Sequence, residues 1–504
     1  MLAKVCAGTT IGLHGVLVEV EADVAGRGFP TFTIVGLPNK AVDEAKDRVR
    51  TAITNAGYEM PDSRITVNLA PADVPKSGSS FDLAIALGVL AANGFISQDK
   101  LNNAMFVGEL SLEGNVRKVT GIIPLLLLAK EQNINTIFIP AANISEAALI
   151  SDLTIYPVES LPELLAHLEN KKLLKSFEGT MLEEEEESID PSYDFAQVQG
   201  QEYAKRAMEI AAAGFHNIHL KGSPGAGKTL LSRSFPTILP RMDKDEILEV
   251  AKIYSVIGDL KKSIFHGLRP FRAPHHTTSR TGLIGGGSMP VPGEISLAHR
   301  GVLFLDEFPE FPRTVLESMR QPIEDGIVTI SRAAGSLTYP SRFLLLAASN
   351  PCPCGFFGHP SRPCVCATGI VTRYQKRLSG PLLDRIDIHI DVPPVEIEKL
   401  AGFVVSEPSK QIRERVAQAR ELQQKRFINT RLQFNSEMSS SDVRKFCSIH
   451  DDAQKLLKQA VEKLSLSARS YFKIIKVSQT IADLSGQDEI STIHIAEALQ
   501  YRQN

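Results

Sequence analysis

The stretch Ile218-His-Leu-Lys-Gly-Ser-Pro-Gly-Ala-Gly-Lys-Thr229 combines an apolar run, a glycine-rich turn and the start of a helix. Its glycines allow a tight turn whose backbone N–H groups cradle phosphates, while Lys228 would reach the outer phosphates and the Thr229 hydroxyl would bind Mg²⁺. The apolar residues before it and the Leu230-Leu231 pair after it supply the strand and helix that this motif requires. We therefore expect a nucleotide site made of Gly222, Ser223, Pro224, Gly225, Ala226, Gly227, Lys228 and Thr229.

The overall composition indicates a multidomain globular protein. The chain has 504 residues, 43% of them apolar and 22% charged, which suggests about three units of ordinary domain size. No apolar run approaches the ~18 residues needed to span a bilayer, and we expect no cleavable leader at the start. We expect a cytoplasmic protein with no membrane partner. Since the net charge is −3, any surface for nucleic acid must be local.

A second apolar run, Gly301-Val-Leu-Phe-Leu-Asp-Glu-Phe308, ends in two adjacent acids. Such a run is typical of a strand that is buried on both faces, and ligands of open α/β sheets bind at the carboxyl ends of such strands. We expect Asp306 to hold Mg²⁺ through water and Glu307 to orient and deprotonate the attacking water. Downstream of a phosphate-binding loop, the pair indicates ATP hydrolysis.

Three more polar residues are candidates for catalysis. Asn350 ends another apolar run, where its amide could position the same water; alternatively it is a turn residue before a proline. Arg385 occupies the place where ring ATPases carry an arginine finger, which stabilises charge on the γ-phosphate of a neighbouring subunit. Arg469 opens a helical stretch and would report the nucleotide state to a helical lid. For both arginines the alternative is an ordinary surface residue.

Residues 1–170 have the alternating strands and small-residue helices of an α/β unit. Their order resembles the proteolytic domain of Lon, in which Ser80 matches the nucleophile and Gly108-Glu-Leu-Ser-Leu-Glu-Gly-Asn-Val116 matches a second motif. The position of the Lon catalytic lysine holds Leu125, which cannot accept a proton from a serine. We expect a Lon-like, S5-type fold without the dyad, used for assembly or DNA contact, with Ser80 as a helix N-cap.

Residues 171–192 are the predicted linker. They include five consecutive glutamates, Glu183 to Glu187, which repel one another and favour a solvated segment. An acidic regulatory tail is the alternative interpretation.

Four of the six cysteines cluster as Cys352-Pro-Cys354 and Cys364-Val-Cys366. The segment between the pairs contains Gly and Pro residues, so a compact loop could bring four sulfurs together. Four thiolates suit a closed, tetrahedral Zn²⁺ site, and a reducing cytosol disfavours disulfides. His359 is an alternative ligand, because the Cys-x-Cys spacing is tighter than the common one.

Two stretches concentrate positive charge. Residues 326–383 contain no Asp or Glu, and within them we expect a hairpin from Ile327 to Tyr339 with Arg332 near its tip. The stretch from Lys261 to Arg300 holds six Lys or Arg against one Glu and includes Arg272 and Arg280. Such charge in the channel of a ring would bind the phosphate backbone of DNA. The alternative is that these arginines form salt bridges between subunits.

Taken together, these residues resemble AAA+ ATPases of the magnesium-chelatase-like group, and most closely the ComM/YifB family. The resemblance covers essentially the whole chain and includes Phe271-Arg-Ala-Pro-His-His-Thr-Thr-Ser279 and Asn350-Pro-Cys-Pro-Cys-Gly355. It implies an α/β fold with these parts: a Lon-like α/β domain at 1–170, a linker at 171–192, an AAA+ P-loop αβα core at 193–395 with a four-cysteine loop at 350–367, and a helical lid at 396–504.

The resemblance also implies a function. Members of this family form ATP-dependent rings, usually hexamers, and the family is implicated in natural transformation through DNA branch migration. The expected partners are branched or single-stranded DNA and copies of the same chain, and the expected cofactors are ATP, Mg²⁺ and structural Zn²⁺. A chelatase-type metal-insertion subunit and a protein-remodelling chaperone are the alternatives. ATPase activity stimulated by DNA, with salt-dependent binding, separates these functions.

Overall fold

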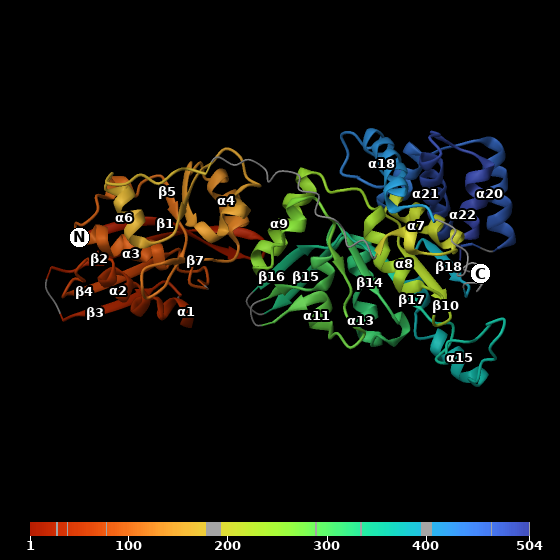
Figure 1. The fold of residues 1–504 in the computed structure, drawn as a ribbon, viewed down its shortest axis with the longest axis horizontal. Coiled ribbons are helices and arrows are strands. Elements are labelled where there is room, and N and C mark those ends of the chain that lie inside the picture. The colour runs from red at the N-terminus through yellow and green to blue at the C-terminus, as the bar shows by residue number, and fades with distance from the viewer. Residues whose placement is uncertain are drawn as a thin grey trace. The chain divides into compact units, whose positions relative to one another are not determined.

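The computed structural model describes the chain apart from residues 27–28, 38, 77, 178–192, 288–289, 333–334, 395–405, 465 and 503–504. The chain divides into two compact units (Figure 1). The first unit comprises Met1–Glu185 and Lys244–His266, and the second comprises Glu186–Asp243 and Gly267–Asn504. The glutamate run of the predicted linker lies outside the described residues. Among the helices that the structure describes, none has the length and apolarity needed to cross a bilayer.

The first unit is built on a seven-stranded sheet with the order β3-β4-β2-β1-β5-β8-β9. β2 pairs antiparallel with β1 and β4, and the remaining neighbours are parallel. Apolar side chains alternate with polar ones along β4, so one side of this strand faces the core. The strands are β1 (Leu2–Ile11), β2 (His14–Val24), β3 (Thr31–Val35), β4 (Arg64–Ala70), β5 (Ala104–Phe106), β8 (Thr136–Pro140) and β9 (Thr154–Val158).

Helices cover both faces of this sheet. Neighbouring strand residues alternate between two apolar clusters: Phe106 belongs to the cluster of α2, α3 and α6, and Met105 to that of α4. The unit is therefore three-layered, and its α/β character is as the sequence predicted. Its other elements are α1 (Lys40–Asp43), α2 (Ala45–Asn55), α3 (Asp82–Ala92), β6 (Glu109–Leu110), β7 (Val116–Arg117), α4 (Ile122–Glu131), α5 (Ile144–Ala147) and α6 (Leu161–Leu168).

A helix from the middle of the chain completes the first unit. α9 (Lys244–Ile257), followed by α10 (Lys262–Phe265), packs against α4. The Ser255 carbonyl accepts a 2.8 Å hydrogen bond from the N–H of Gly121, and the Ser255 hydroxyl donates to the buried carboxylate of Glu146. Residues 244–266 thus belong structurally to the first unit, although the sequence places them inside the predicted 193–395 core.

The second unit contains a five-stranded parallel sheet with the order β11-β14-β17-β10-β18. β14 and β17 are buried along their whole length, which explains their unbroken apolar sequences. The strands are β10 (Ile218–Gly222), β11 (Phe271–Arg272), β14 (Val302–Leu305), β17 (Leu344–Ser349) and β18 (Ile388–Val392). The helices of this core are α7 (Glu202–Gly214), α8 (Lys228–Ser234), α11 (Arg280–Ile284), α12 (Glu294–Leu297), α13 (Arg313–Ser318), α14 (Arg320–Asp325), α15 (Thr368–Gln375) and α16 (Gly380–Leu383).

Two hairpins interrupt this core. β12 (Gly285–Gly286) pairs with β13 (Val291–Pro292), and β15 (Ile327–Arg332) pairs with β16 (Gly335–Pro340). The second is the predicted hairpin, and its register confirms that Arg332 is the last residue before the turn. The hairpins contact each other, because the Tyr339 hydroxyl donates to the Pro290 carbonyl at 2.8 Å.

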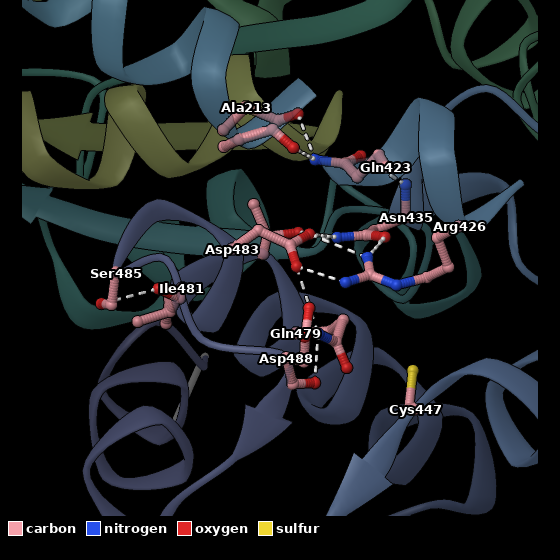
Figure 2. A network of polar contacts seen from close by, with 12 residues as sticks. Ala213, Gln423, Arg426, Asn435, Cys447, Gln479, Ile481, Asp483, Ser485 and Asp488 are labelled. Carbon is pink, nitrogen blue, oxygen red and sulfur yellow. Dashed lines mark hydrogen bonds and ion pairs between the residues drawn. The ribbon is translucent and has the colours of Figure 1, made fainter. Parts of the chain in front are cut away.

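A helical lid follows the core, as the sequence predicted, although its predicted start at residue 396 lies outside the described residues. A buried polar network ties the lid together (Figure 2). Asp483 binds Arg426 and Asn435, and Gln423 of the same network donates to the Ala213 carbonyl in α7 at 3.0 Å. The lid elements are α18 (Ser409–Arg426), α19 (Ser440–Phe446), β19 (Ser448–Ile449), α20 (Asp451–Lys463), α21 (Ala468–Leu484), β20 (Glu489–Ile490) and α22 (Thr492–Gln500).

Candidate nucleotide site and cysteine cluster

The predicted phosphate-binding loop connects β10 to α8 at the carboxyl edge of the sheet. Gly225 and Gly227 have φ angles of +79° and +86°, a region that glycine adopts readily and other residues do not. Gly227 directly precedes the first helical residue, Lys228. The strand, loop and helix expected from the sequence are therefore all present, with backbone N–H groups at the amino end of α8.

The Lys228 side chain lies within this loop. Its ammonium group donates to the carbonyls of Gly222 at 2.7 Å and Ser223 at 2.9 Å, and to the Asn350 side chain at 3.1 Å. Burial lowers the pKa of Lys228, while the nearby Asp306 acts in the opposite direction. Asn350 is thus more than a turn residue, since the fold brings its amide to the phosphate-binding lysine.

Thr229 of α8 also meets Asp306, the residue that follows β14. The Thr229 hydroxyl donates to Oδ2 of Asp306 at 3.1 Å, and Oδ1 accepts from the N–H of Glu307 at 2.9 Å. The two strands before these residues, β10 and β14, are both neighbours of β17, so their ends lie at one edge of the sheet. A hydroxyl and a carboxylate oxygen at this spacing are suitable ligands for Mg²⁺.

Glu307 has a partner that the sequence did not reveal. Its Oε2 atom lies 3.1 Å from Nδ1 of His276, and its backbone has a φ of +50°. The His276 ring also makes an edge contact with Phe311. His276 therefore holds the carboxylate of the predicted catalytic base on one side.

The signal for His276 was present in the sequence but could not be interpreted. The stretch Phe271 to Ser279 belongs to the family resemblance, which assigns it no role. In the structure β11 pairs with β14 in parallel, with Arg272 opposite Leu303. His276 lies four residues after Arg272, and Glu307 lies four residues after Leu303, so the two residues follow their strands at the same distance. His276 and Glu307 meet because β11 and β14 are neighbours in the sheet, and the sequence does not state this strand order.

Arg385 and Arg469 lie together, away from the loop. β10 and β18 are parallel neighbours, so the phosphate-binding loop leaves the carboxyl edge while Arg385 precedes β18 at the amino edge. Strands of this length separate the two edges by roughly 13 Å. At the amino edge, Arg385 and Arg469 both form ion pairs with Glu324. These three residues and Lys473 help to line a cavity of about 600 Å³. The predicted finger and lid arginines thus form one site, separate from the phosphate-binding loop of their own chain.

The four clustered cysteines converge. Their sulfur atoms all lie within 4.8 Å of one another, and the contacts include 3.3 Å between Cys352 and Cys354 and 3.7 Å between Cys352 and Cys364. A tetrahedral Zn²⁺ site with Zn–S bonds of about 2.3 Å would space its sulfurs by about 3.8 Å. The residues present, including Cys366, therefore fit a four-thiolate zinc site.

Backbone N–H groups support this cluster. Phe357 donates to the sulfur of Cys352 at 3.3 Å, and the N–H groups of Phe356 and Val365 lower the pKa of Cys354 to about 6. A thiolate, the form that binds metal, is thus favoured at Cys354 near neutral pH, whereas burial and the neighbouring cysteines raise the pKa of Cys364 and Cys366. The alternative ligand His359 is engaged elsewhere, since its Nδ1 atom accepts from two backbone N–H groups of its own turn.

The three predicted DNA-binding arginines differ in their surroundings. Arg280 is exposed at the first position of α11, and Arg332 ends β15 at the hairpin turn. Arg272 instead forms a two-point ion pair with Glu294, at 2.6 and 2.7 Å. This pair engages the guanidinium within the chain, which argues against a phosphate-binding role for Arg272.

In the first unit, Leu125 lies in the apolar core of α4 and is 1% exposed. The position that matches the Lon lysine therefore contributes to packing. The prediction that Ser80 caps a helix is wrong: α3 begins at Asp82 with Phe81 at the N-cap and no side-chain cap. The buried carboxylate of Asp82 instead forms a bidentate ion pair with Arg48.

The parallel sheet, the phosphate-binding loop, the paired acids and the helical lid define an AAA+ ATPase. Family models confirm this class: "Magnesium chelatase, subunit ChlI" matches residues 194–400, "Subunit ChlI of Mg-chelatase" matches 20–143, and the "Magnesium chelatase, subunit ChlI C-terminal" model matches 406–502.

Several known proteins are similar to this chain. Competence protein ComM of Haemophilus influenzae is 43% identical, over 99% of this chain and 97% of its own length. YifB of Escherichia coli is 40% identical, again over 99% and 97%. A Lon protease of Acinetobacter baumannii is 29% identical over 32% of this chain and 20% of the protease. The chain belongs to the ComM/YifB family of magnesium-chelatase-like AAA+ ATPases.

Proposed function

We propose that this ATPase is a hexameric DNA translocase that promotes branch migration of branched DNA, in recombination or in natural transformation. The ATP site supplies the energy, and the paired hairpins supply the contact with DNA. The name of the relative in Haemophilus influenzae, a competence protein, supports a role in competence.

The observation that carries this proposal is the contact between the two hairpins. They are more than thirty residues apart in the sequence, yet Tyr339 of one donates to Pro290 of the other. A Cβ atom at Gly285 would lie 2.9 Å from the Cδ1 atom of Ile330, so the Ile330 side chain packs against the backbone of the first hairpin. Arg332 ends β15 of the second hairpin, and Arg280 begins α11, the helix directly before the first hairpin. A pair of packed hairpins with one arginine at a turn and another in the helix directly before them is suited to follow a phosphate backbone.

The catalytic arrangement requires a neighbouring subunit. Lys228, Thr229 and Asp306 would hold the triphosphate and its Mg²⁺, whose charge stabilises the developing negative charge on the phosphoryl group. Glu307 would take a proton from the attacking water. Arg385 and Arg469 lie at the opposite edge of their own sheet, so we propose that both act on the nucleotide of the next subunit in a ring.

We also propose that Cys352, Cys354, Cys364 and Cys366 hold one structural Zn²⁺. The sulfur spacing supports this site, since it agrees with a tetrahedral arrangement. Metal analysis of protein purified without chelators should find one zinc per chain. A metal content near zero would reject the site.

Strand exchange on a labelled four-way DNA junction tests the proposed function. Wild-type protein with ATP should convert the junction into duplex products by branch migration, and Lys228→Ala should not. ATPase activity measured with and without DNA separates a second candidate, a chelatase-type motor, which the match to magnesium chelatase subunit models favours. Such a motor would show no stimulation of its ATPase activity by DNA.

A further inference from the structure

The cysteine cluster begins two residues after a residue of the nucleotide site. Asn350, which accepts a hydrogen bond from Lys228 at 3.1 Å, is followed by Pro351 and then by Cys352, which is fully buried. The Pro351 carbonyl accepts a hydrogen bond from Gln375 of α15, the helix that follows the last cysteine. Both ends of the cysteine loop are therefore tied to the segment that carries Asn350.

The same loop contacts the phosphate-binding loop directly. A Cβ atom at Gly355 would lie 2.4 Å from Cδ and 2.5 Å from Cγ of Pro224. These distances mean that the Gly355 backbone lies against the proline ring with no room for a side chain. Because the ring of Pro224 is rigid, it cannot turn aside as a flexible side chain would.

The conformation of Gly355 depends on the cysteine cluster. Its φ is +83°, and its N–H donates to the Cys352 carbonyl at 2.9 Å, which closes a tight turn around Cys354. This turn places the sulfurs of Cys352 and Cys354 3.3 Å apart. Cross-linking the sulfurs through one metal would restrict the loop to this turn, which removes the entropy of alternative loop conformations.

We propose that the metal-bound cysteine loop is a working part of the nucleotide site: it positions Pro224 and Asn350, so that metal occupancy sets the affinity for ATP. This inference rests on the proposed zinc site. Gly355 and Pro224 are positioning residues, since they act on the nucleotide through the phosphate-binding loop.

Two glycines of this loop give a matched test. Gly358 has a φ of +78°, close to that of Gly355, but a Cβ atom at Gly358 would meet nothing within 4 Å. Alanine at either position carries a similar backbone strain, and only Gly355→Ala collides with Pro224. The difference between the two variants therefore isolates the contact with the phosphate-binding loop.

Binding of a fluorescent ATP analogue would be measured for both variants, together with zinc content and thermal unfolding without nucleotide. We expect Gly355→Ala to weaken binding at least about tenfold, with the same zinc content and unfolding temperature as Gly358→Ala. Gly358→Ala should bind as wild type does. Equal affinities for the two variants would refute a role of the contact between Gly355 and Pro224 in nucleotide binding.

Metal removal tests the role of occupancy. Zinc-depleted protein should bind the analogue at least about tenfold more weakly and recover when zinc is returned, whereas a Cys354→Ser, Cys364→Ser variant should stay weak. Wild-type affinity for the analogue in zinc-depleted protein would refute the coupling between zinc and nucleotide binding, even if metal analysis finds zinc at the site. If purified wild-type protein contains no zinc, the metal site itself is refuted. The two measurements therefore distinguish a failure of the zinc site from a failure of its coupling to ATP binding.

Discussion

The Nδ1 atom of His276 lies 3.1 Å from Oε2 of Glu307, which places a ring from the β11–α11 connection against the predicted catalytic base. The Glu307 side chain is half exposed, so this contact is well placed to orient it. His276→Ala should lower kcat for ATP hydrolysis about tenfold, with little change in KM, because a misplaced base affects the chemical step and not nucleotide binding.

His275→Ala is the matched control for this prediction. The His275 ring packs against His276, but its Nδ1 atom faces Thr277, so its removal leaves the contact with Glu307 in place. Steady-state kinetics should show near wild-type kcat for this variant. Equal kcat values for both histidine variants would contradict a positioning role for His276.

The pairing of Arg385 and Arg469 with Glu324 predicts complementation between subunits. Arg385→Ala should bind ATP but not hydrolyse it, because the missing charge belongs to a neighbour's site. Mixed with inactive Lys228→Ala, it should recover ATPase activity, since some interfaces then combine an intact Lys228 with an intact Arg385. The measurement is ATP turnover as a function of mixing ratio.

A second mixture supplies the control for this experiment. Lys228→Ala and Glu307→Gln both damage residues at the carboxyl edge of the same sheet. Every chain in this mixture lacks either Lys228 or Glu307, and one nucleotide site needs both from the same chain. Activity should therefore stay at background. Recovery in this control, or none in the first mixture, would refute the assignment of Arg385 to the neighbouring nucleotide.

The surroundings of the three predicted DNA-binding arginines lead to different salt dependences. Arg280→Ala and Arg332→Ala should each reduce the slope of log K against log salt by about one, because each removes a phosphate contact. Arg272→Ala should leave this slope unchanged, since Arg272 pairs with Glu294. Fluorescence anisotropy with labelled single-stranded DNA at several salt concentrations checks all three. A reduced slope for Arg272→Ala alone would reverse these roles.

The network around Asp483 predicts how the lid responds to mutation (Figure 2). The Asp483 side chain is fully buried and pairs with Arg426. Asp483→Ala should destabilise the protein by about 3–5 kcal/mol, because a buried guanidinium is left without its counter-charge. Lys455→Ala removes an exposed ion pair of the same lid and should have little effect. Denaturant unfolding of both variants makes the comparison, and similar midpoints would contradict it.

The nucleotide site could be predicted from the sequence because local patterns specify most of it. A buried strand followed by the glycine-rich loop predicts where Lys228 and Thr229 lie, and apolar runs that end in Asp306 and Asn350 predict neighbouring strands. Strands of one parallel sheet end at the same edge, so these four residues had to approach one another. The hydrogen bonds between them agree with that expectation.

The remaining features depend on contacts that no local pattern specifies. His276 reaches Glu307 only because β11 is the edge strand beside β14, and the order of strands is not written in either segment. Ser80 had the residue type of an N-cap, but α3 begins two residues after it. Likewise, α9 has an apolar side, but nothing in its own sequence states which unit covers that side.

The docking of α9 has a practical consequence for dissecting this protein. The polypeptide passes between the units three times, at 178–192, near residue 243 and again near residue 266, so the first unit is not a removable leader. A truncation that starts at residue 193 would remove α4, the helix against which α9 packs. Conversely, protease nicking within 178–192 should yield two fragments that elute together on gel filtration, held by the packing of α9 against α4.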